Sequence, residues 1–577
     1  MPDGAHLCAS LRIWAVPAPD RVPTGITTSP CHRSTRTRQC APCTQPCAWR
    51  QCEVGVTCVT VVATPAYEGV PVGDQTSDYI IIGAGSSGSV LARRLLDAGH
   101  SVHVIEAGPV DSNPNIHSPQ GWPALLLSDN DWKVMTTPQH HAADRSLYWP
   151  RGKMLGGSSS MNGMIYIRGH RDDYDAWAAA GNTGWGWDAV LPLFKRSEDH
   201  EDGASEFHGS GGPLHVSRLQ NLHPASQAFV DAAVALGHPL TEDFNAKMME
   251  GVGFNHATIK DGRRHSAWQA FVAPVLENSA LTVTTDALVT RLVLDGARAI
   301  GVEYVTAAGT QIARAAAEII VSAGTIGSPK ILQLSGIGAR DDLDAAGIER
   351  RVELPGVGKN LHDHLLVGNI YATGEPLVPG RNNLLEAQLF AHSSQADDDA
   401  PDLQPLFLHL PYPTDGGRVP EQGYTIAPGL VAPRSRGTLR VASADPATAP
   451  IVDPNILADD YDVEALADAV IMCRQIGGHD AFAPFRPTEY VPETTPVTRD
   501  EIRALIRALA GTYHHQVGTC RMGVDDHAVV DPALRVVGVS GLRVVDASIM
   551  PTIPRGNTNA PSIMIGEKAS DLILSDI

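Results

Sequence analysis

Three glycines near residue 85 have the spacing of a phosphate-binding turn. Gly83, Gly85 and Gly88 follow a strand-like run over residues 78–82 and precede a helical pattern over 89–98. In such a turn the first glycine permits a tight bend, the second lets the backbone approach a pyrophosphate, and the third lets the helix pack on the strand. The helix N-terminus then presents free N–H groups to the phosphates. This spacing predicts a nucleotide site.

A second strand-like run, residues 101–106, ends in Glu106, 18 residues after Gly88. An acid at this place accepts hydrogen bonds from the hydroxyls of an adenosine ribose and argues against a 2′-phosphate. A glycine turn alone is weak evidence, but here strand, glycines, helix, second strand and acid occur in order. We therefore expect a dinucleotide, and this region leaves both FAD and NAD open.

Two adjacent histidines near the C-terminus, His514 and His515, could move protons because imidazole titrates near neutral pH. If the segment is extended, their side chains point to opposite faces and only one can face a cofactor. Further on, Asn559 precedes a helical pattern with Pro561 in its first turn. Asparagine is a good N-cap, so Asn559 is expected to cap this helix, to contact the cofactor, or to do both.

The elements that must position these residues alternate from Asp78 to the C-terminus. Apolar strand-like runs follow helical patterns and turn signals, which predicts an α/β architecture. The stretch from about 340 to 500 is richer in Pro and Asp and is expected to hold a variable, substrate-facing part. A chain of 577 residues can bury one large core or several.

Residues 1–75 differ in composition from the rest and hold seven of the nine cysteines. They are rich in Pro, Thr, Arg and Cys and lack clear periodicity. The short gaps between Cys40, Cys43, Cys47 and Cys52 do not suit the separated ligand pairs of a zinc site. We expect a disordered extension or a start codon assigned too far upstream, with a metal site as a third alternative. No metal site is expected elsewhere in the chain.

Composition limits the partners and the location. A net charge of -20 argues against nucleic acid and against an anionic membrane surface. No apolar run reaches the roughly 18 residues of a membrane span, and no secretory signal is visible. Outside the first 75 residues only Cys473 and Cys520 are present, which is typical of a reduced compartment. We expect a soluble cytoplasmic enzyme without a transmembrane segment, one that could form a homodimer.

Three further motifs occur in order after the glycine turn: residues 148–169, 322–338 and 514–523, the last continued by 541–548 and 556–561. Together with the glycine turn they resemble the glucose–methanol–choline (GMC) oxidoreductase family, and most of all its choline dehydrogenase-like bacterial branch. The resemblance runs from about Asp78 to the C-terminus.

The resemblance implies FAD-dependent oxidation of an alcohol to an aldehyde or ketone, with hydride transfer to flavin N5. Electrons would pass to oxygen, a quinone or another carrier, and a dehydrogenase is favoured over an oxidase. The implied fold is a Rossmann-type FAD-binding domain interleaved with an α+β substrate domain built on an antiparallel sheet. Residues 76–340 are then mainly FAD-binding, 341–505 mainly substrate-binding, and 506–577 return to the FAD domain with the catalytic residues.

Site residues follow from the resemblance, position by position. His515 is implied to abstract the hydroxyl proton, whereas His514 falls where a bulky residue often sits. Asn557, at a His-or-Asn position, is implied to bind the substrate oxygen. The motifs imply the following FAD-binding residues: Gly83, Gly85, Ser86, Ser87, Gly88, Glu106, Arg151, Gly156, Gly157, Ser158, Asn162, Gly163, Met164, Val289, Asp546, Ala547, Asn557 and Asn559.

Two of the aligned positions bear on how the cofactor is held. Val289 matches an adenine-side valine but fits a core strand residue equally well. Met161 stands where some members attach the flavin through histidine. Because methionine has no nucleophilic nitrogen, we expect non-covalent FAD.

Two other functions stay open from the sequence. Some relatives on this fold keep FAD structurally and act as lyases on cyanohydrin-like substrates, and an NAD-dependent dehydrogenase could use the same glycine turn. The alcohol is not identified. Choline would need an aromatic cage or a carboxylate, and the sequence places neither, so aliphatic, aromatic and polyol substrates remain alternatives.

Overall fold

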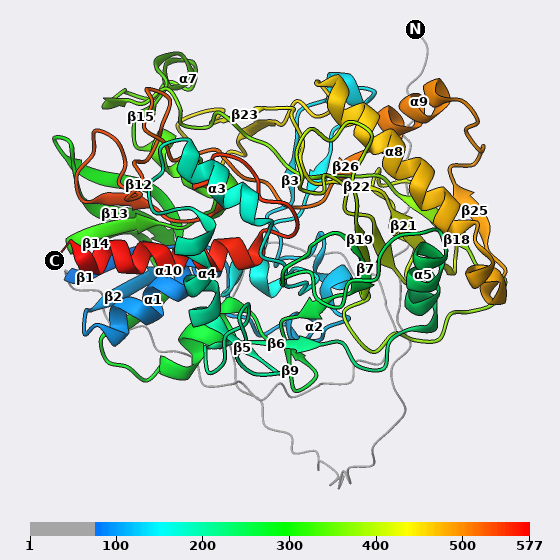
Figure 1. Ribbon diagram of the computed structural model, residues 1–577. Helices are drawn as coiled ribbons and strands as arrows, with labels where there is room; N and C mark the ends of the chain where they lie inside the picture. The colour runs from blue at the N-terminus through cyan, green and yellow to red at the C-terminus, as the bar shows by residue number, and fades with distance from the viewer. Residues whose placement is uncertain (1–75, 577) are drawn as a thin grey trace, which may run out of the picture. The chain divides into compact units, whose positions relative to one another are not determined.

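Two large sheets organise residues 76–576, the part of the chain that the computed structural model describes (Figure 1). The first contains β1 (Thr76–Ile82), β2 (Val102–Ile105), β11 (Leu281–Thr284), β12 (Leu288–Asp295), β13 (Arg298–Thr306), β14 (Gly309–Val321) and β27 (Leu542–Val544). The second contains β7 (Gly251–Phe254), β18 (Asn369–Ala372), β19 (Ala387–Phe390), β20 (Leu406–Leu408), β21 (Gly423–Ala427) and β25 (Thr488–Val491). The expectations for the N-terminal cysteine-rich segment lie outside the described residues.

The first sheet has the order β11-β2-β1-β14-β13-β12, with β27 also paired to β14. Strands β11, β2, β1, β14 and β27 pair in parallel, whereas β12 and β13 form an antiparallel extension on the first half of β14. The central strands are apolar and fully buried at their C-terminal ends, as in Ile80–Ile82 of β1. Parallel strands covered on both faces show this pattern. The predicted mixture of helices and sheets is confirmed.

Helices α1 (Ser86–Asp97) and α10 (Asn559–Ser575) lie side by side against this sheet (Figure 1). Helix α1 begins three residues before the predicted 89, so Ser86 and Ser87 form its first turn. A side chain at Gly566 of α10 would place its β carbon 2.8 Å from the carbonyl oxygen of Ser87. Glycine at this position therefore permits the close approach of the two helices.

The second sheet has the order β25-β18-β21-β20-β19-β7, and its neighbours pair antiparallel. Helices α5 (Pro224–Ala235) and α8 (Asp460–Gly477) pack against it. Most of its strands come from the stretch expected to face substrate, but β7 is drawn from residues 251–254. The sheet therefore joins segments that lie on both sides of residue 340.

Short strands connect the chain's C-terminal part to its middle. Strand β26 (Gly511–Thr512) pairs with β17 (Leu365–Leu366), which also pairs with β22 (Gly429–Leu430). This pairing brings residues 362–366 beside His514 and His515. Both Cys473 and Cys520 are buried as free thiols. Between residues 76 and 576, none of the helices combines the length and the apolar character needed to cross a membrane.

Candidate functional site

A cavity of about 730 Å³ runs from the glycine turn after β1 to the second sheet. This volume lies in the upper part of the range usual for ligand pockets, about 300–1,000 Å³. All predicted site residues except two line it: Gly83, Gly85, Ser86, Ser87, Glu106, Arg151, Gly157, Ser158, Asn162, Gly163, Met164, Val289, His515, Asp546, Ala547, Asn557 and Asn559. Segments that are hundreds of residues apart in the sequence therefore line the same cavity.

The two exceptions, Gly88 and Gly156, shape the backbone without lining the cavity. A β carbon at Gly88 would lie 2.1 Å from the carbonyl oxygen of Gly83, so this glycine lets α1 start directly behind the turn. Gly156 has φ +89°, a left-handed conformation that favours glycine. Gly83 also needs to be glycine, because its φ is +101° and a β carbon would meet Ser322 O at 2.4 Å.

The N-termini of α1 and α10 meet at the cavity. Ser86 Oγ donates to Asn559 Oδ1 at 2.7 Å, and Ser87 Oγ donates to the carbonyl of Ser562 at 2.7 Å. The prediction that Asn559 caps α10 is wrong, since Thr558 holds the N-cap position and Asn559 is the first helical residue. Its side chain ties the two helices together instead. The positive ends of two helix dipoles therefore face the same space.

Two carboxylates, Glu106 and Asp546, are the acids that line the cavity among the described residues. Glu106 accepts hydrogen bonds from the backbone N–H groups of Ala84 and Gly108, each at 2.9 Å. Burial raises the pKa of Glu106 to about 7. Asp546 accepts from the N–H of Gly324 at 2.9 Å, and burial raises its pKa too. Both acids thus brace the backbone around the glycine turn.

His515 and Asn557 lie together at the far end of the cavity. Asn557 Oδ1 accepts from Gln404 Nε2 at 3.2 Å, which turns the Asn557 amide nitrogen toward His515 Nε2 at 3.1 Å. Because an amide nitrogen only donates, Nε2 must present its lone pair. The ring proton is then on Nδ1, which donates to His364 Nδ1 at 3.0 Å.

Neighbouring groups fix the His515 ring and keep it neutral. The backbone N–H of His515 donates to Asp363 Oδ1 at 2.7 Å, and the Tyr513 ring stacks on the imidazole with centroids 4.8 Å apart. Burial lowers the pKa of His515 well below its usual 6.5, and it lowers the pKa of His364 to about 3. His515 is therefore an unprotonated base, and its Nε2 accepts a hydrogen bond from the amide of Asn557.

His514 takes a separate place. Its φ of +71° lies in the left-handed region, so the His514–His515 segment is not extended as the alternation argument assumed. Its Nε2 contacts the Tyr412 hydroxyl at 2.8 Å, and Arg151 donates to its carbonyl. Only His515 contacts Asn557.

The wall around this end of the cavity is apolar. Its side chains belong to one packed cluster that also contains Tyr513. The cluster members that line the cavity are Trp122, Leu126, Met164, Ile165, Leu366, Leu385, Leu406, Leu408 and Tyr412. Met161 lies in the cavity wall as well and is buried. Val289 is buried in β12 and also lines the cavity, so its position is compatible both with a core strand residue and with an adenine-side valine.

Several functional residues were missed by the sequence reasoning. His364 and Asp363 come from the Asn360–His364 segment, where an acid between two histidines was an available signal. Gln404 stands alone in an apolar strand region, and nothing in its surroundings marks it. Each of these residues reaches His515 or Asn557 only through the fold.

Comparison with protein families matches the GMC oxidoreductase family models to residues 77–366 and 433–566. The chain is 41% identical over 533 residues to the alcohol dehydrogenase [acceptor] of Pseudomonas putida, covering 87% of this chain and 96% of that protein. It is also 41% identical over 532 residues to the mitochondrial choline dehydrogenase of Homo sapiens, covering 86% and 89%.

Solved structures show the same fold. Pyridoxine 4-oxidase from Mesorbium loti superposes with a TM-score of 0.82 at 37% identity, covering 86% of this chain and 98% of that one. Formate oxidase, from a structure series on FAD modification in Aspergillus oryzae, has a TM-score of 0.81 at 27% identity, covering 88% and 99%.

Proposed function

Because the chain belongs to the GMC oxidoreductase family, we propose that it binds FAD and oxidises an uncharged alcohol at the carbon bearing the hydroxyl group. The contact between His515 Nε2 and the Asn557 amide, at the apolar end of the cavity, carries this proposal. A dehydrogenase that passes electrons to a separate acceptor is the preferred form. The comparisons lend no support to a non-redox lyase.

The cavity fits FAD at its glycine end. The turn at Gly83 and the N-termini of α1 and α10 offer N–H groups to a pyrophosphate. Glu106, at the end of β2, would accept from the ribose hydroxyls. These groups support the proposal of a Rossmann-type nucleotide-binding half. When bound, FAD supplies the two-electron acceptor for the alcohol's hydride.

The chain's own residues handle the proton and the oxygen. The lone pair of His515 Nε2, which accepts from Asn557 Nδ2 in the structure, takes the hydroxyl proton of the alcohol when the substrate oxygen replaces this contact. Asn557 Nδ2 donates a hydrogen bond to the same oxygen and holds it while the C–H bond breaks. The Nδ1–H of His515 keeps its bond to His364, so the ring does not rotate as its charge changes.

The apolar wall favours an alcohol without a charge. A quaternary ammonium needs a carboxylate or an open aromatic cage. The acids that line the described cavity, Glu106 and Asp546, accept backbone hydrogen bonds at the glycine end. Leu366, Leu385, Leu406 and Leu408 line the other end together with Trp122, Tyr412 and Tyr513, and no acid of the described residues lines the cavity beside these rings. We therefore propose an aliphatic or aromatic alcohol as substrate in preference to choline.

An anaerobic titration with a panel of alcohols tests the proposal. Aliphatic and aromatic alcohols are expected to bleach the absorbance of the oxidised flavin. In steady-state assays with an artificial electron acceptor, kcat/KM for choline is expected to be at least tenfold lower than for the best neutral alcohol. Failure of every alcohol to bleach the flavin would reject oxidation. Bleaching by choline as efficient as by the best neutral alcohol would reject only the substrate class.

Non-covalent attachment has its own test. Met161 offers no nucleophile to the flavin, so acid precipitation of the holoenzyme is expected to leave the yellow colour in the supernatant. Yellow colour that remains in the pellet would show a covalent link.

A further inference from the structure

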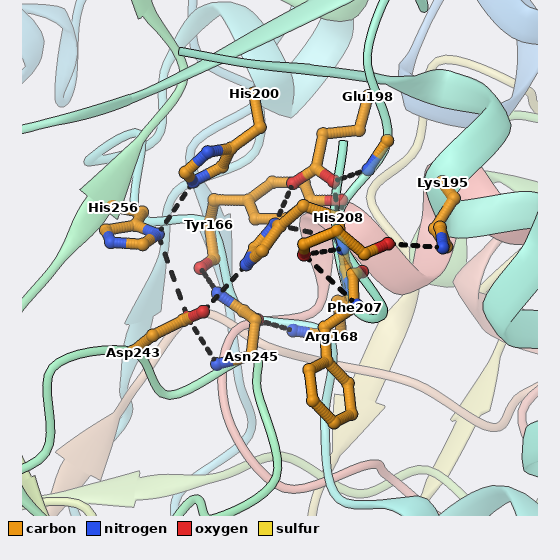
Figure 2. Close-up of polar contacts among 12 residues, drawn as sticks. Tyr166, Arg168, Lys195, Glu198, His200, Phe207, His208, Asp243, Asn245 and His256 are labelled. Carbon is orange, nitrogen blue, oxygen red and sulfur yellow. Dashed lines mark hydrogen bonds and ion pairs between the residues drawn. The ribbon is translucent and has the colours of Figure 1, made fainter. Parts of the chain in front are cut away.

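Three buried histidines, His200, His208 and His256, form a cluster (Figure 2). None of them lines the cavity that holds His515. His200 ends β5 (Glu198–His200), His256 begins β8 (His256–Ala257), and His208 lies in the loop between β5 and β6 (Leu214–Arg218). These three short strands form one sheet, in the order β5-β6-β8. Asp243, from the segment before β7, completes the group.

The donor atoms are close enough to share an ion. One ring nitrogen from each histidine lies within 4.8 Å of the other two, and His200 Nε2 is 3.2 Å from His256 Nδ1. Asp243 places one oxygen 2.7 Å from His208 Nε2 and the other 3.8 Å from His256 Nδ1. Ligands of a tetrahedral zinc ion lie roughly 3.3 Å apart, given bonds of about 2.0–2.1 Å. The separations scatter around this value.

A second layer of groups orients His208. Its Nδ1 faces Glu198 Oε1 at 3.0 Å, which leaves Nε2 directed at Asp243. Glu198 is itself held by Arg168 at 2.6 Å and by the Gly209 N–H at 2.7 Å (Figure 2). Metal-binding histidines characteristically donate their other N–H to a carboxylate in this way.

The cluster also contains one unpaired polar atom. His200 Nε2 donates to His256 Nδ1 at 3.2 Å, and buried His256 Nε2 has no hydrogen-bond partner among the described residues. A buried unpaired polar group calls for an ion, a water or a functional role. A cation between the rings would replace the hydrogen bond from His200 to His256 and bind both nitrogens. The His200 proton would then move to Nδ1, which in the structure accepts from the Asp202 N–H at 3.3 Å, so this contact must open when the ion binds.

We propose that His200 Nε2, His208 Nε2, His256 Nδ1 and the Asp243 carboxylate bind one zinc-class divalent ion. Three imidazoles and one carboxylate suit Zn²⁺ or Co²⁺ better than Mg²⁺ or Ca²⁺, which prefer oxygen ligands. All four ligands come from the protein and are buried or nearly so, so the site is closed and structural. The ion joins the β5-β6-β8 sheet to the segment that leads into β7.

Cobalt binding to the untagged holoenzyme tests the site. After chelator treatment and desalting, Co²⁺ is added, and bound metal is measured by mass spectrometry together with the visible spectrum. His200→Asn combined with His256→Asn is expected to lose about one bound equivalent relative to the wild type. The wild-type spectrum is expected to show tetrahedral ligand-field bands that the double variant lacks.

Controls separate this site from others. His215→Asn, on the neighbouring strand β6, is expected to keep the wild-type metal content. The N-terminal cysteines could also take up Co²⁺, but thiolate charge-transfer bands identify that binding, and it would persist in the double variant. The flavin absorbance and alcohol turnover of each variant report folding. Equal Co²⁺ binding and equal spectra in wild type and double variant overturn the proposal, as does wild-type protein without ligand-field bands.

Discussion

At the scale of residues, the proposed chemistry depends on the protonation of one ring. Asn557 donates to His515 Nε2 because Gln404 donates to the amide oxygen of Asn557. His364 accepts the hydrogen bond from the Nδ1–H of His515. The base is thus prepared by three side chains from three separate segments. The direction of these hydrogen bonds determines which nitrogen of His515 carries the proton, since these side chains are neutral.

His515→Ala removes the proposed base. We expect kcat/KM for the best alcohol to fall about 10²- to 10⁴-fold, the usual contribution of a positioned base. FAD content is expected to stay at the wild-type level, because His515 lies at the far end of the cavity from the glycine turn. Steady-state kinetics and the flavin-to-protein absorbance ratio check this. Near-wild-type turnover would remove His515 from the mechanism.

Gln404→Leu tests the amide's orientation without touching the base. Losing one hydrogen bond of about 1.4 kcal/mol lets Asn557 rotate, so kcat/KM is expected to fall about tenfold. Gln388→Leu is the matched control, since Gln388 accepts from Gln404 but does not contact Asn557. A smaller loss is expected in the Gln388 variant, and an equal loss would mean that the bond from Gln404 to Asn557 alone does not explain the effect, because Gln388 holds the same amide nitrogen.

The residues of this site differ in how far the sequence could predict them. His515 and Asn557 could be placed because each lies inside a long motif with a fixed spacing. Gln404 and His364 could not, because their roles depend on β26 pairing with β17 and on the loop before β20. Such pairings join residues more than 100 positions apart, and no local pattern encodes them.

At the scale of elements, two helices aim their positive ends at one space. Helix α1 follows the glycine turn and α10 is the last helix of the chain, yet Ser86 and Asn559 bond directly. Capping by Asn559 was one of two roles expected from the sequence, and the structure gives the N-cap position to Thr558. Asparagine is often found at helix N-caps. Here the Asn559 side chain instead accepts a hydrogen bond from Ser86 of α1.

Gly566→Val tests the approach of α1 and α10. Its β carbon would lie 2.8 Å from Ser87 O and 2.9 Å from Val90 Cβ, so the helices must separate. Overpacking of this kind costs about 1–3 kcal/mol, and FAD affinity is expected to fall as the two N-termini move apart. Thermal unfolding and FAD titration of the apoprotein measure both effects.

Asp571→Ala is the control on the same helix. Its side chain is half exposed and pairs with Arg196, so a small effect is expected. Comparable losses of FAD affinity in both variants would mean that α10 tolerates no change and that the contact at Gly566 is not special.

At the scale of the whole molecule, many histidines are buried as neutral rings. Burial lowers the pKa of His103 and His265 to about 4, and that of His364, His409 and His514 to about 3. Neutral burial favours the folded state above the unfolded pKa of about 6.5. As the pH falls through that value, the unfolded chain takes up protons that the folded chain refuses, and stability declines.

We therefore expect the melting temperature to fall between pH 7 and pH 5. Each such histidine contributes up to about 1.4 kcal/mol per pH unit. Glu106 and Asp363 act in the opposite sense, because their raised pKa values of about 7 and 6 stabilise the folded state as they protonate. Burial also raises the pKa of Asp173, Asp462 and Asp546, and, against the effect of its burial, hydrogen bonds to Asp243 and Glu198 raise the pKa of His208 to about 9. The ten described histidines with a lowered pKa outnumber the six groups that act in the opposite sense. Calorimetry of the holoenzyme at constant ionic strength checks this, and a constant or rising melting temperature would contradict it.

The general architecture was easier to predict than its boundaries. Alternating strand and helix patterns, with the motifs in order, were enough for an α/β fold of the GMC type. Strand β7 could not be assigned to the second sheet, because a strand of four residues, two of them glycines, carries little pattern. The histidine cluster was equally hidden, since its members are separated in sequence and become neighbours only when β5 and β8 flank β6.

The bond between Ser86 and Asn559 spans 473 positions of the chain. A nascent chain on the ribosome therefore makes its glycine turn early and must wait for the final helix before the cofactor site exists. The N-terminal half can collapse as it emerges, but the cofactor site then lacks Asn559, and the face of α1 that packs against α10 is uncovered. We therefore expect FAD to bind only after synthesis of the chain is complete, and a chain truncated before Asn559 to bind no FAD, which the flavin absorbance of the purified protein would show.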